Sequence, residues 1–411
     1  MASLTKLATR NVLRNRRRSL ITLFAIAGGL GLMIFSANIG FGSYQEMIRV
    51  GVSSLAGAVV IQGEGYQEEQ DSEIVVEDGD AVAAAVAAEH PDAVVVQRMF
   101  LQGLLNSPVN SVGVGVTAIQ PGQEAQVSDW NEKIVEGEYL DDDARGIVIG
   151  VAMADTLGVE VGDKLVMMTQ GEDDVTSRLF RVRGLFRTGS AEMDGFIALI
   201  HIDAARELTG LPTASNQVSL HLPNIKDAEA IAASLGATYS GQALEVLTWQ
   251  QAIPAINGLI EQDRKSNNIM MVFIGVIVAF GVLNTVLMSV MERIREFGVM
   301  LSLGMAPRYL SRLVMMEGLF LGTFAVAVGV AGAAAVTIPL SSSGMDMSSM
   351  LGGTETMDMA GIAISAVIYP AMDWGRIIGL CVGSVLLTAL ASAYPAWRAA
   401  QLKPVEAMNH V

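Results

Sequence analysis

Cysteine and histidine are scarce in this chain, and this scarcity limits the metal chemistry open to it. Of its 411 residues, one is cysteine, Cys381, and four are histidines. A single thiol can form neither a disulfide within the chain nor a cysteine-based metal site, and the histidines share no metal-ligand spacing. We therefore interpret Cys381 as a small apolar residue inside a hydrophobic segment, and we expect no metal site.

The motifs of several enzyme classes are also missing. The sequence has no Gly-x-x-x-x-Gly-Lys-Ser/Thr phosphate-binding loop, no Gly-x-Ser-x-Gly nucleophile elbow and no His-Glu-x-x-His zinc pair. Two acidic runs, at residues 141–143 and 172–174, lack the glycine-punctuated loop of a calcium site, so solvated turns are the favoured interpretation. Nothing in the sequence indicates catalysis.

Methionines gather in the segment of residues 340–374. They are Met345, Met347, Met350, Met357 and Met359. Clustered thioethers can bind copper, but neither cysteine nor histidine accompanies them here. An adaptable apolar contact surface is the favoured interpretation.

Charged residues are few, at 17% of the chain, whereas 51% of the residues are hydrophobic. The longest apolar runs cover residues 20–41, 269–291, 313–338 and 377–394. Runs of about 18 to 25 apolar residues are long enough to cross the hydrocarbon core of a bilayer as helices. The sequence therefore predicts an integral α-helical membrane protein with four transmembrane helices.

A long polar stretch separates the first apolar run from the second. Residues 44–266 hold 34 acidic and 13 basic side chains, whereas the rest of the chain is net basic. Short β-rich runs and short helical patterns alternate along this stretch. They lie at residues 146–150, 164–169 and 179–184 for the strands, and at 152–157 and 204–208 for the helices. We expect a large extracytoplasmic α+β domain between helices one and two, too acidic to bind nucleic acid.

Basic residues before the first run set the expected orientation. Lys6, Arg10, Arg14 and residues 16–18 form a cluster without an acidic side chain. The positive-inside rule places this end in the cytoplasm, and four spans bring the tail with Arg398 back to the same side. A cleaved signal peptide is the competing interpretation, but its apolar region would be unusually long.

These expectations divide the chain into nine segments. They are a cytoplasmic N-terminus at 1–19, helix one at 20–42, the extracytoplasmic domain with its stalks at 43–266, helix two at 267–291, a cytoplasmic coupling region at 292–312, helix three at 313–339, an extracytoplasmic loop at 340–375, helix four at 376–394 and a cytoplasmic tail at 395–411.

The most informative polar residues lie in the link between helices two and three. Its candidate site residues are Glu292, Arg293, Arg295, Glu296, Phe297, Gly298, Leu303 and Gly304. Charges of both signs could simply anchor the link at the membrane interface. However, an anchor does not need the apolar side chains beside them, so a short helix presented to a cytoplasmic partner is favoured.

Small and polar residues inside the expected spans suggest helix packing. Gly375, Gly379 and Gly383 recur at four-residue spacing, and Gly318 and Gly322 begin a similar stripe. Such stripes let helices approach closely in lipid, either within the chain or against a second copy. Asn284 would be costly facing lipid, so we expect it to form a hydrogen bond across a helix interface.

Several of these segments together resemble a known family. The run Glu292-Arg-Ile-Arg-Glu-Phe-Gly-Val-Met-Leu-Ser-Leu-Gly304, followed by Glu317-Gly318, is similar to the signature of the FtsX-like, MacB-type ABC transporter permeases. The N-terminal Arg10-Asn-Val-Leu-Arg-Asn, the C-terminal Tyr394-Pro-Ala-Trp-Arg and the Gly146-Ile-Val-Ile-Gly run resemble other parts of the same family.

This resemblance implies a transport subunit of the bacterial inner membrane and not an enzyme. It implies a dimer with a second permease copy or paralogue, and cytoplasmic ABC ATPase subunits that bind ATP and magnesium, so that this chain itself needs no cofactor. The residues of the link after helix two would receive the motion of the ATPase. The stalks would transmit it to the outer domain, so that the substrate moves outside the membrane.

Within the family, the chain looks most similar to the lipoprotein-releasing branch. There the substrate is a lipoprotein in the membrane lipid, handed to a periplasmic carrier or adaptor that docks partly on a proline-containing hook. The equivalent stretch here, residues 169–178, is short and acidic and has no proline. Export of a peptide, toxin or drug with an outer-membrane partner, as in MacB, and a cell-division regulator of the same fold are the alternatives.

Overall fold

The computed structural model describes residues 16–69, 71–171, 174–351, 356–359 and 362–402. The chain divides into two units. The helical unit comprises Met1–Tyr44, Glu261–Met345 and Ile368–Val411, and the sheet unit comprises Gln45–Ile260 and Asp346–Val367. Most of the N-terminal basic cluster, residues 172 and 173 of the acidic turn, and the side chains of Met350, Met357 and Met359 lie outside the described part of the chain.

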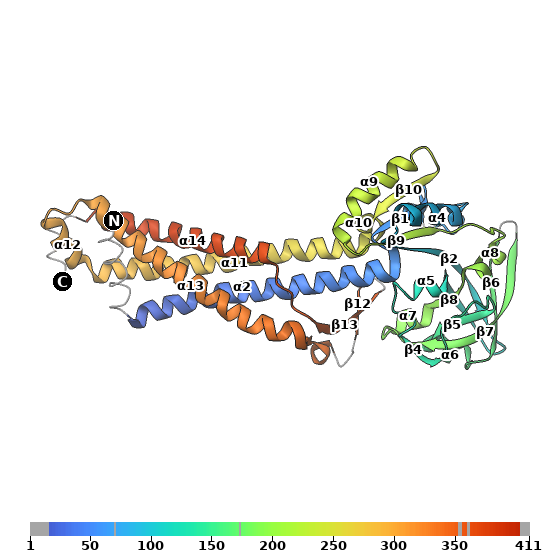
Figure 1. The fold of residues 1–411 in the computed structure, drawn as a ribbon. Coiled ribbons are helices and arrows are strands. Elements are labelled where there is room, and N and C mark those ends of the chain that lie inside the picture. Colours follow the sequence, from blue (N-terminus) through green and yellow to red (C-terminus); the bar gives the residue numbers. More distant parts are fainter. Residues whose placement is uncertain (1–15, 70, 172–173, 352–355, 360–361, 403–411) are drawn as a thin grey trace. The chain divides into compact units, whose positions relative to one another are not determined.

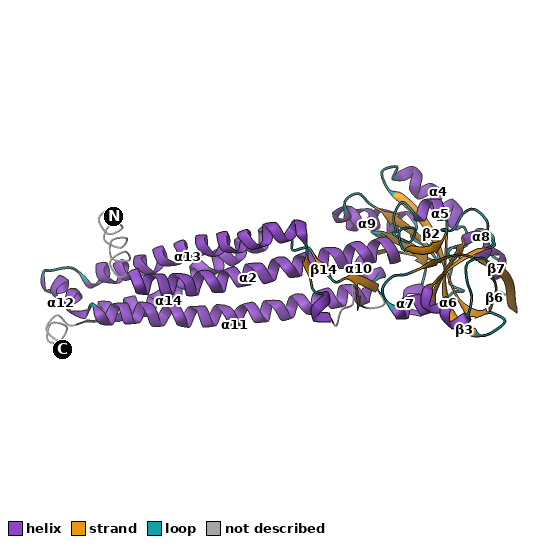
Figure 2. Cartoon of the chain, turned by 90° about the horizontal axis from the view of Figure 1, so that it is seen from below, coloured by secondary structure: helices purple, strands orange, loops and turns teal. Residues whose placement is uncertain are grey.

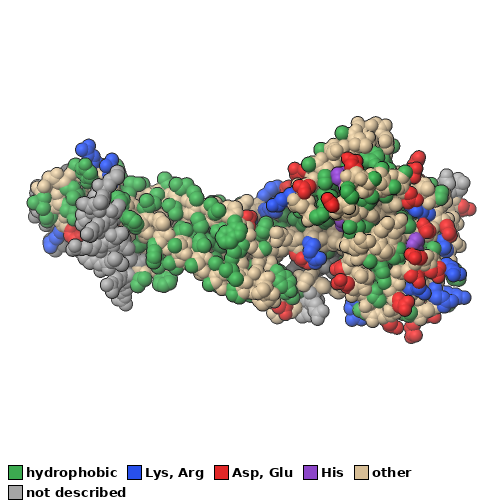
Figure 3. All heavy atoms as spheres, viewed as in Figure 1, with side chains coloured by type: hydrophobic (Ala, Val, Ile, Leu, Met, Phe, Trp, Pro, Cys, Tyr) green, Lys and Arg blue, Asp and Glu red, His purple; other side chains and the backbone are tan. Residues whose placement is uncertain are grey.

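Four long helices build the helical unit and lie side by side in both views (Figures 1 and 2). They are α2 (Arg16–Gly51), α11 (Pro254–Glu292), α13 (Pro307–Ser343) and α14 (Trp374–Ala400). Each is long and apolar enough to cross a membrane, and hydrophobic side chains cover this unit (Figure 3). With 36 and 39 residues, α2 and α11 are about 54 and 58 Å long, nearly twice the ~30 Å hydrocarbon core.

The end of α13 corrects one expectation from the sequence. Pro339 was expected to end the third helix, but the helix continues to Ser343 with Pro339 inside it. Proline removes only one backbone donor, and serine hydroxyls cover carbonyls of this last turn. Ser341 donates to the Ile338 carbonyl at 2.8 Å, and Ser342 and Ser343 donate to that of Pro339 at 2.9 and 3.1 Å. The helix ends at Gly344, whose φ of +73° suits glycine.

Close backbone approach holds α13 against α14. A Cβ atom added to Gly318 would lie 2.2 Å from Ser392 Oγ, and one added to Gly322 would lie 2.6 Å from Thr388 Cγ2. Only glycine fits at such distances. The close helix packing predicted for Gly318 and Gly322 is therefore confirmed.

Polar contacts tie α2 to two other helices. Asn38 donates to the Thr337 hydroxyl of α13 at 3.1 Å, and both side chains are buried. Further along, the Tyr44 hydroxyl donates to the Asp263 carboxylate of α11, and the Arg264 guanidinium lies 5.2 Å from the centre of the Tyr44 ring. These contacts fix the registration of α2 in the unit.

Six strands of the sheet unit close into a barrel. They follow one another around the ring as β2 (Val94–Asn106), β3 (Ser111–Ile119), β8 (Ile197–His201), β5 (Gly146–Gly150), β7 (Val175–Phe186) and β6 (Lys164–Gln170), which returns to β2. A seventh strand, β4 (Ile134–Gly137), pairs with β7 outside the ring. Buried side chains such as Leu105, Met167, Phe180 and Ile200 form its core.

The sequence predicted several of these barrel elements. The runs at residues 146–150, 164–169 and 179–184 lie in β5, β6 and β7, and β6 alternates between exposed and buried positions as a half-exposed strand should. The two short helices are confirmed as α6 (Val151–Leu157) and α8 (Ile202–Thr209). In the acidic turn before β5, Asp141 pairs with Arg183 and Asp143 with Arg145.

A second layer packs beside the barrel. Its antiparallel sheet runs β10 (Leu244–Thr248), β1 (Val59–Gly63), β9 (Gln217–His221) and the first half of β2. Helices α4 (Gly79–Glu89) and α9 (Ala228–Thr238) cover this sheet through a shared apolar core. Because β2 takes part in both sheets, it joins the two halves of the unit.

Short elements complete the sheet unit. They are η1 (Val52–Ala56), a π-helix directly after α2, then α3 (Tyr66–Glu69), α5 (Pro121–Glu124), α7 (Ala191–Phe196), η2 (Ile225–Asp227), α10 (Trp249–Ala252), η3 (Ser348–Leu351), and the strand pair β12 (Thr356–Met359) and β13 (Ile362–Ser365). A further pair, β11 (Met345–Asp346) and β14 (Val367–Ile368), contains the two boundaries along the chain at which the units change.

Candidate functional site

The link between α11 and α13 folds into one short helix, α12 (Ile294–Ser302). Arg293 separates it from α11 and adopts a non-helical backbone conformation. At its other end Gly304 turns the chain with a φ of +91°, a conformation that side chains with a Cβ rarely adopt. The residue after α12, Leu303, and the first residue of α13, Pro307, lie either side of this turn.

Arg293 is the centre of a buried ionic cluster. Its Nε donates to Glu296 at 2.9 Å, and its Nη1 donates to both carboxylate oxygens of Glu317 in α13 at 3.1 Å. The guanidinium also lies 5.0 Å from the centre of the Phe297 ring. Only 7% of Arg293 is exposed. The cluster therefore ties the start of α12 to α13.

The pKa of Arg293 reflects the two carboxylates around it. Burial alone would lower this pKa, but Glu317 and Glu296 together raise it above its ordinary value. The guanidinium thus stays charged although it is desolvated. Such a pair, with both partners in place, braces the helix without leaving an uncompensated charge.

The two faces of α12 differ sharply. One face buries Ile294, Phe297 and Gly298, and Phe297 packs with apolar side chains of α11, α13 and α14. The opposite face carries Arg295 and Val299, and Leu303 follows four residues further on, directly after the last residue of α12, where it is 83% exposed. We call these three residues the exposed stripe of α12.

The residues predicted for this link therefore fall into a buried group and an exposed group. Arg293, Phe297 and Gly298 lie inside and hold α12 in place, whereas Glu292, Arg295 and Leu303 lie on the surface. Glu296 is half-buried beside Arg293. Only the surface residues are placed to touch another protein directly.

Sequence reasoning did not find every residue of this region. The Glu317 carboxylate was noted only as part of a motif, although an acidic residue in an apolar helix is a signal for a buried partner. Near the start of α13, Arg308 and Arg312 lie 5.7 and 5.9 Å from the centre of the exposed Tyr309 ring. Figure 3 shows Lys or Arg side chains at this end of the helical unit.

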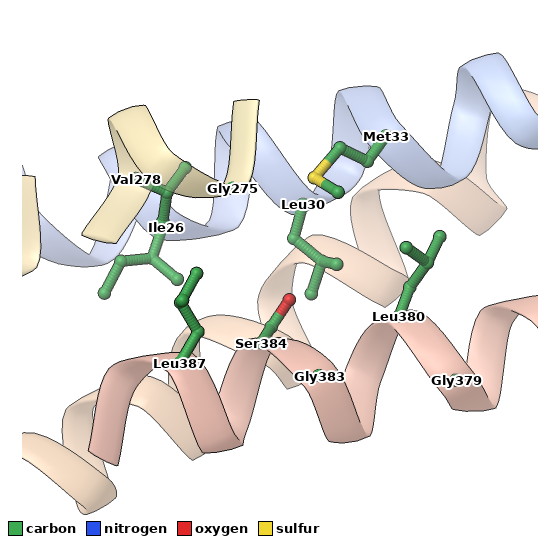
Figure 4. A pocket seen from close by; sticks show the side chains of 10 residues that line it. All are labelled: Ile26, Leu30, Met33, Gly275, Val278, Gly379, Leu380, Gly383, Ser384 and Leu387. Carbon is green, nitrogen blue, oxygen red and sulfur yellow. The ribbon is translucent and has the colours of Figure 1, made fainter. Parts of the chain in front are cut away.

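The predicted packing stripe of α14 has a different environment from that of α13. A Cβ atom added to Gly379 or Gly383 would meet no atom within 4 Å, and one added to Gly375 would meet only Asp373 of its own helix. Gly379 and Gly383 instead border a groove between α14, α2 and α11 (Figure 4). The groove holds about 470 Å³ of empty space, counting its open mouth.

Asn284 is also exposed, and its side chain forms no hydrogen bond within the part of the chain that the structure describes. The expected hydrogen bond is therefore not formed among the described helices of this chain, and it stays a prediction for contact with a second copy. The reason is that α11 turns Asn284 away from its neighbours. Packing of Asn284 and the α14 glycines against a second copy stays a prediction.

Two family models match the chain. The MacB-like periplasmic core domain matches residues 19–238, and the FtsX-like permease C-terminal domain matches residues 268–404. The chain belongs to the FtsX-like, MacB-type ABC transporter permease family. As a permease of this family it is a membrane protein with an extracytoplasmic α+β domain, and the resemblance noted in its motifs is confirmed.

Curated relatives of this permease include lipoprotein-releasing proteins. The lipoprotein-releasing system transmembrane protein LolC of Neisseria meningitidis serogroup B is 26% identical over 75% of this chain and 76% of its own length. LolC of Xylella fastidiosa is 23% identical over 95% of this chain and 94% of its own length. The pyoverdine export ATP-binding/permease protein PvdT of Pseudomonas putida is 24% identical over 96% of this chain and 58% of its own length.

Among solved structures, the periplasmic region of MacB from Actinobacillus actinomycetemcomitans aligns with half of this permease at 13% identity and a TM-score of 0.37. That alignment covers 94% of the MacB region.

Proposed function

We propose that this permease couples ATP hydrolysis on separate cytoplasmic ABC ATPase subunits to the movement of a substrate on the periplasmic side of the inner membrane. In this proposal the sheet unit is the extracytoplasmic domain between the first and second spans, and both termini are cytoplasmic. Two permeases, identical or paralogous, form the dimer. ATP and magnesium bind to the ATPase, and this chain needs no cofactor.

The observation that carries the proposal is the two-sided structure of α12. Its inner face is braced by the ionic cluster of Arg293, Glu296 and Glu317, so α12 and α13 should move together when α12 is pushed. Its exposed stripe offers one cation and two apolar side chains to a partner. Leu303 is 83% exposed and Val299 is 48% exposed, so a partner seated on the stripe would remove two apolar side chains from water.

A lipoprotein is the substrate class that we favour. Both LolC relatives are named for lipoprotein release, and one aligns along nearly the whole chain. Export is the second candidate, favoured by the alignment with PvdT and by the connection from β6 to β7, which has no proline hook.

Substitution of the exposed stripe tests the ATPase contact. The full-length permease is purified from its native membranes, and co-purifying ABC ATPase is identified by mass spectrometry and quantified. We expect Leu303→Asp to reduce the recovered ATPase about tenfold or more, because a carboxylate cannot be buried in an apolar contact. Val135→Asp is the matched control, because Val135 is also an exposed apolar residue, at 55%, but lies on β4 of the sheet unit.

Equal recovery of the ATPase with both variants would show that α12 is not the docking element. Loss of ATPase in both would instead indicate a general effect on folding, which the unfolding temperatures of the two variants would reveal.

A further inference from the structure

The C-terminal end of α2 meets the sheet unit at an unusual turn. Beyond Gly51 the helix continues as the π-helix η1, which ends at Gly57 with a φ of +84°. The Gly57 N–H donates to the Val52 carbonyl at 2.7 Å and closes this wide turn. A π-helix holds fewer of its carbonyls in regular bonds than an α-helix and often marks a functional position.

A buried arginine covers one of the carbonyls at this turn. The Nη2 atom of Arg98, in β2, donates to the Ser53 carbonyl oxygen of η1 at 2.8 Å. The same guanidinium forms a two-pronged pair with Glu124 of α5, through Nε at 3.0 Å and Nη2 at 2.8 Å. Arg98 is fully buried and Glu124 is 1% exposed.

Arg98 lies at the position where the two halves of the sheet unit join. In the registers of β2, Arg98 is paired with Gln217 of β9 on one side and with Ile119 of β3 on the other. It is therefore the residue at which β2 passes from the second layer into the barrel. One side chain thus contacts the end of α2 at the junction of both halves of the sheet unit.

The start of α11 joins α2 at the same level. A Cβ atom added to Gly51 would lie 2.9 Å from Ile256 Cδ1 and 3.0 Å from Ile253 Cδ1, so the two helices are in close contact directly before η1. Both isoleucines are buried. Within the sheet unit, α2 and α11 are thus packed together where Arg98 holds η1.

We propose that Arg98 is a positioning residue that fixes the end of α2 to strand β2, so that displacement of α2 moves the sheet unit as one body. The chemistry explains the residue type. A guanidinium has a planar fork that can hold a carboxylate and still donate to a carbonyl, and its positive charge suits the negative end of the helix dipole. A buried ion pair is weak evidence for stability alone, and pairs of this kind can often be replaced by apolar residues without loss of stability.

Replacement of this ion pair by apolar residues tests the proposal. The double variant Arg98→Met with Glu124→Leu keeps the site filled and leaves no unpaired charge, but it removes the donor to Ser53. Hydrogen exchange of the full-length permease in detergent, read by mass spectrometry, is expected to be about tenfold faster at residues 52–56 in this variant. Exchange in β3 and β5 is expected to stay unchanged.

A second buried arginine of the sheet unit provides the matched control. Arg206 donates to Asp80 at 2.8 Å and to Gln97 at 3.1 Å and is 7% exposed, but it does not contact η1. We expect Arg206→Met to leave exchange at residues 52–56 unchanged. Acceleration there by both variants would reduce Arg98 to a general structural role and overturn the proposal, as would unchanged exchange in the double variant.

If the double variant fails to fold, Arg98→Lys answers the same question. A single ammonium lacks the planar fork, so faster exchange at residues 52–56 is again expected, and unchanged exchange would overturn the proposal. The transport consequence rests on the proposed function: the double variant should keep the ATPase and lose substrate movement. Because the exchange measurement needs neither ATPase nor substrate, its failure and that of the proposed function can be told apart.

Discussion

His221 shows how burial fixes the charge of one side chain in the sheet unit. Burial, and then the positive charge of Arg98, lower its pKa to about 3. The imidazole is therefore neutral in the folded protein at neutral pH. Its pKa in an unfolded chain is about 6.5, so the unfolded state takes up the proton first as the pH falls.

The resulting stability is complete above pH 6.5 and is lost progressively from there down to about pH 3. We expect protonation of His221 in the unfolded chain to lower the free energy of unfolding of the sheet unit by about 2 kcal/mol as the pH falls from 7 to 5. Denaturant unfolding of the wild type and of His221→Gln at the two pH values measures it. The glutamine variant should lose less stability than the wild type by that amount, and an equal loss in both would contradict the assignment.

Single residues also show where sequence reasoning reaches its limit. Arg293 and Glu296 were predicted to belong to one link because they lie close together in the sequence. Their third partner, Glu317, lies 24 residues from Arg293, beyond a turn, and a single sequence does not say which residues such a turn brings together. The sequence therefore indicated this link as a candidate but not its division into a buried brace and an exposed stripe.

The glycine pairs of α13 and α14 have the same spacing, but we expect opposite effects when a larger side chain replaces them. Gly322 of α13 lies against Thr388 of α14, so Gly322→Leu should overpack the contact and destabilise the protein by about 1–3 kcal/mol. Gly379 of α14 has open space beside it, so Gly379→Leu should change stability by less than about 0.5 kcal/mol. Thermal unfolding of the two variants in the same detergent compares them.

Comparable losses in the two variants would show that the groove beside Gly379 is filled in the purified protein. Cross-linking of purified protein would then show whether a second copy fills it. Spacing alone did not separate these two stripes, because glycines that let helices meet and glycines that border a groove have the same four-residue pattern.

Elements with a strong local pattern were the ones predicted correctly. β6 could be recognised because its alternating residues face a core on one side and solvent on the other. The end of α13 could not, because the helix tolerates Pro339 inside it and the serine hydroxyls that cover its last carbonyls come after the proline. A local sequence pattern predicts where an element begins or ends only when contacts with neighbouring side chains do not change that position.

At the scale of the molecule, the closed barrel depends on long-range pairing that no local pattern encodes. β2 pairs with β6 more than 60 residues later, and β3 pairs in parallel with β8 across about 80 residues. The four apolar runs, by contrast, needed only length and composition to be recognised as candidate spans. The membrane part was therefore predictable in outline, whereas the topology of the sheet unit was not.

The two substrate classes differ in the work that the whole transporter must perform. Each buried CH₂ group of an acyl chain contributes about 0.8 kcal/mol to membrane binding, so a protein with three long acyl chains does not leave a bilayer spontaneously. Its release needs coupled ATP hydrolysis, whereas a soluble peptide leaves the membrane surface without it. A transporter for lipoproteins should therefore distinguish between substrates by acylation.

We expect vesicles that contain the permease and its ATPase to release a triacylated lipoprotein to soluble albumin only when ATP is present. Release should fall to background with Leu303→Asp, since the proposed contact with the ATPase would be lost, and should persist with Val135→Asp. The same lipoprotein without its acyl chains should neither be moved nor stimulate ATP hydrolysis. Stimulation by the unacylated protein, without release of the acylated one, would instead favour export, because the transporter would then recognise the polypeptide and not the lipid.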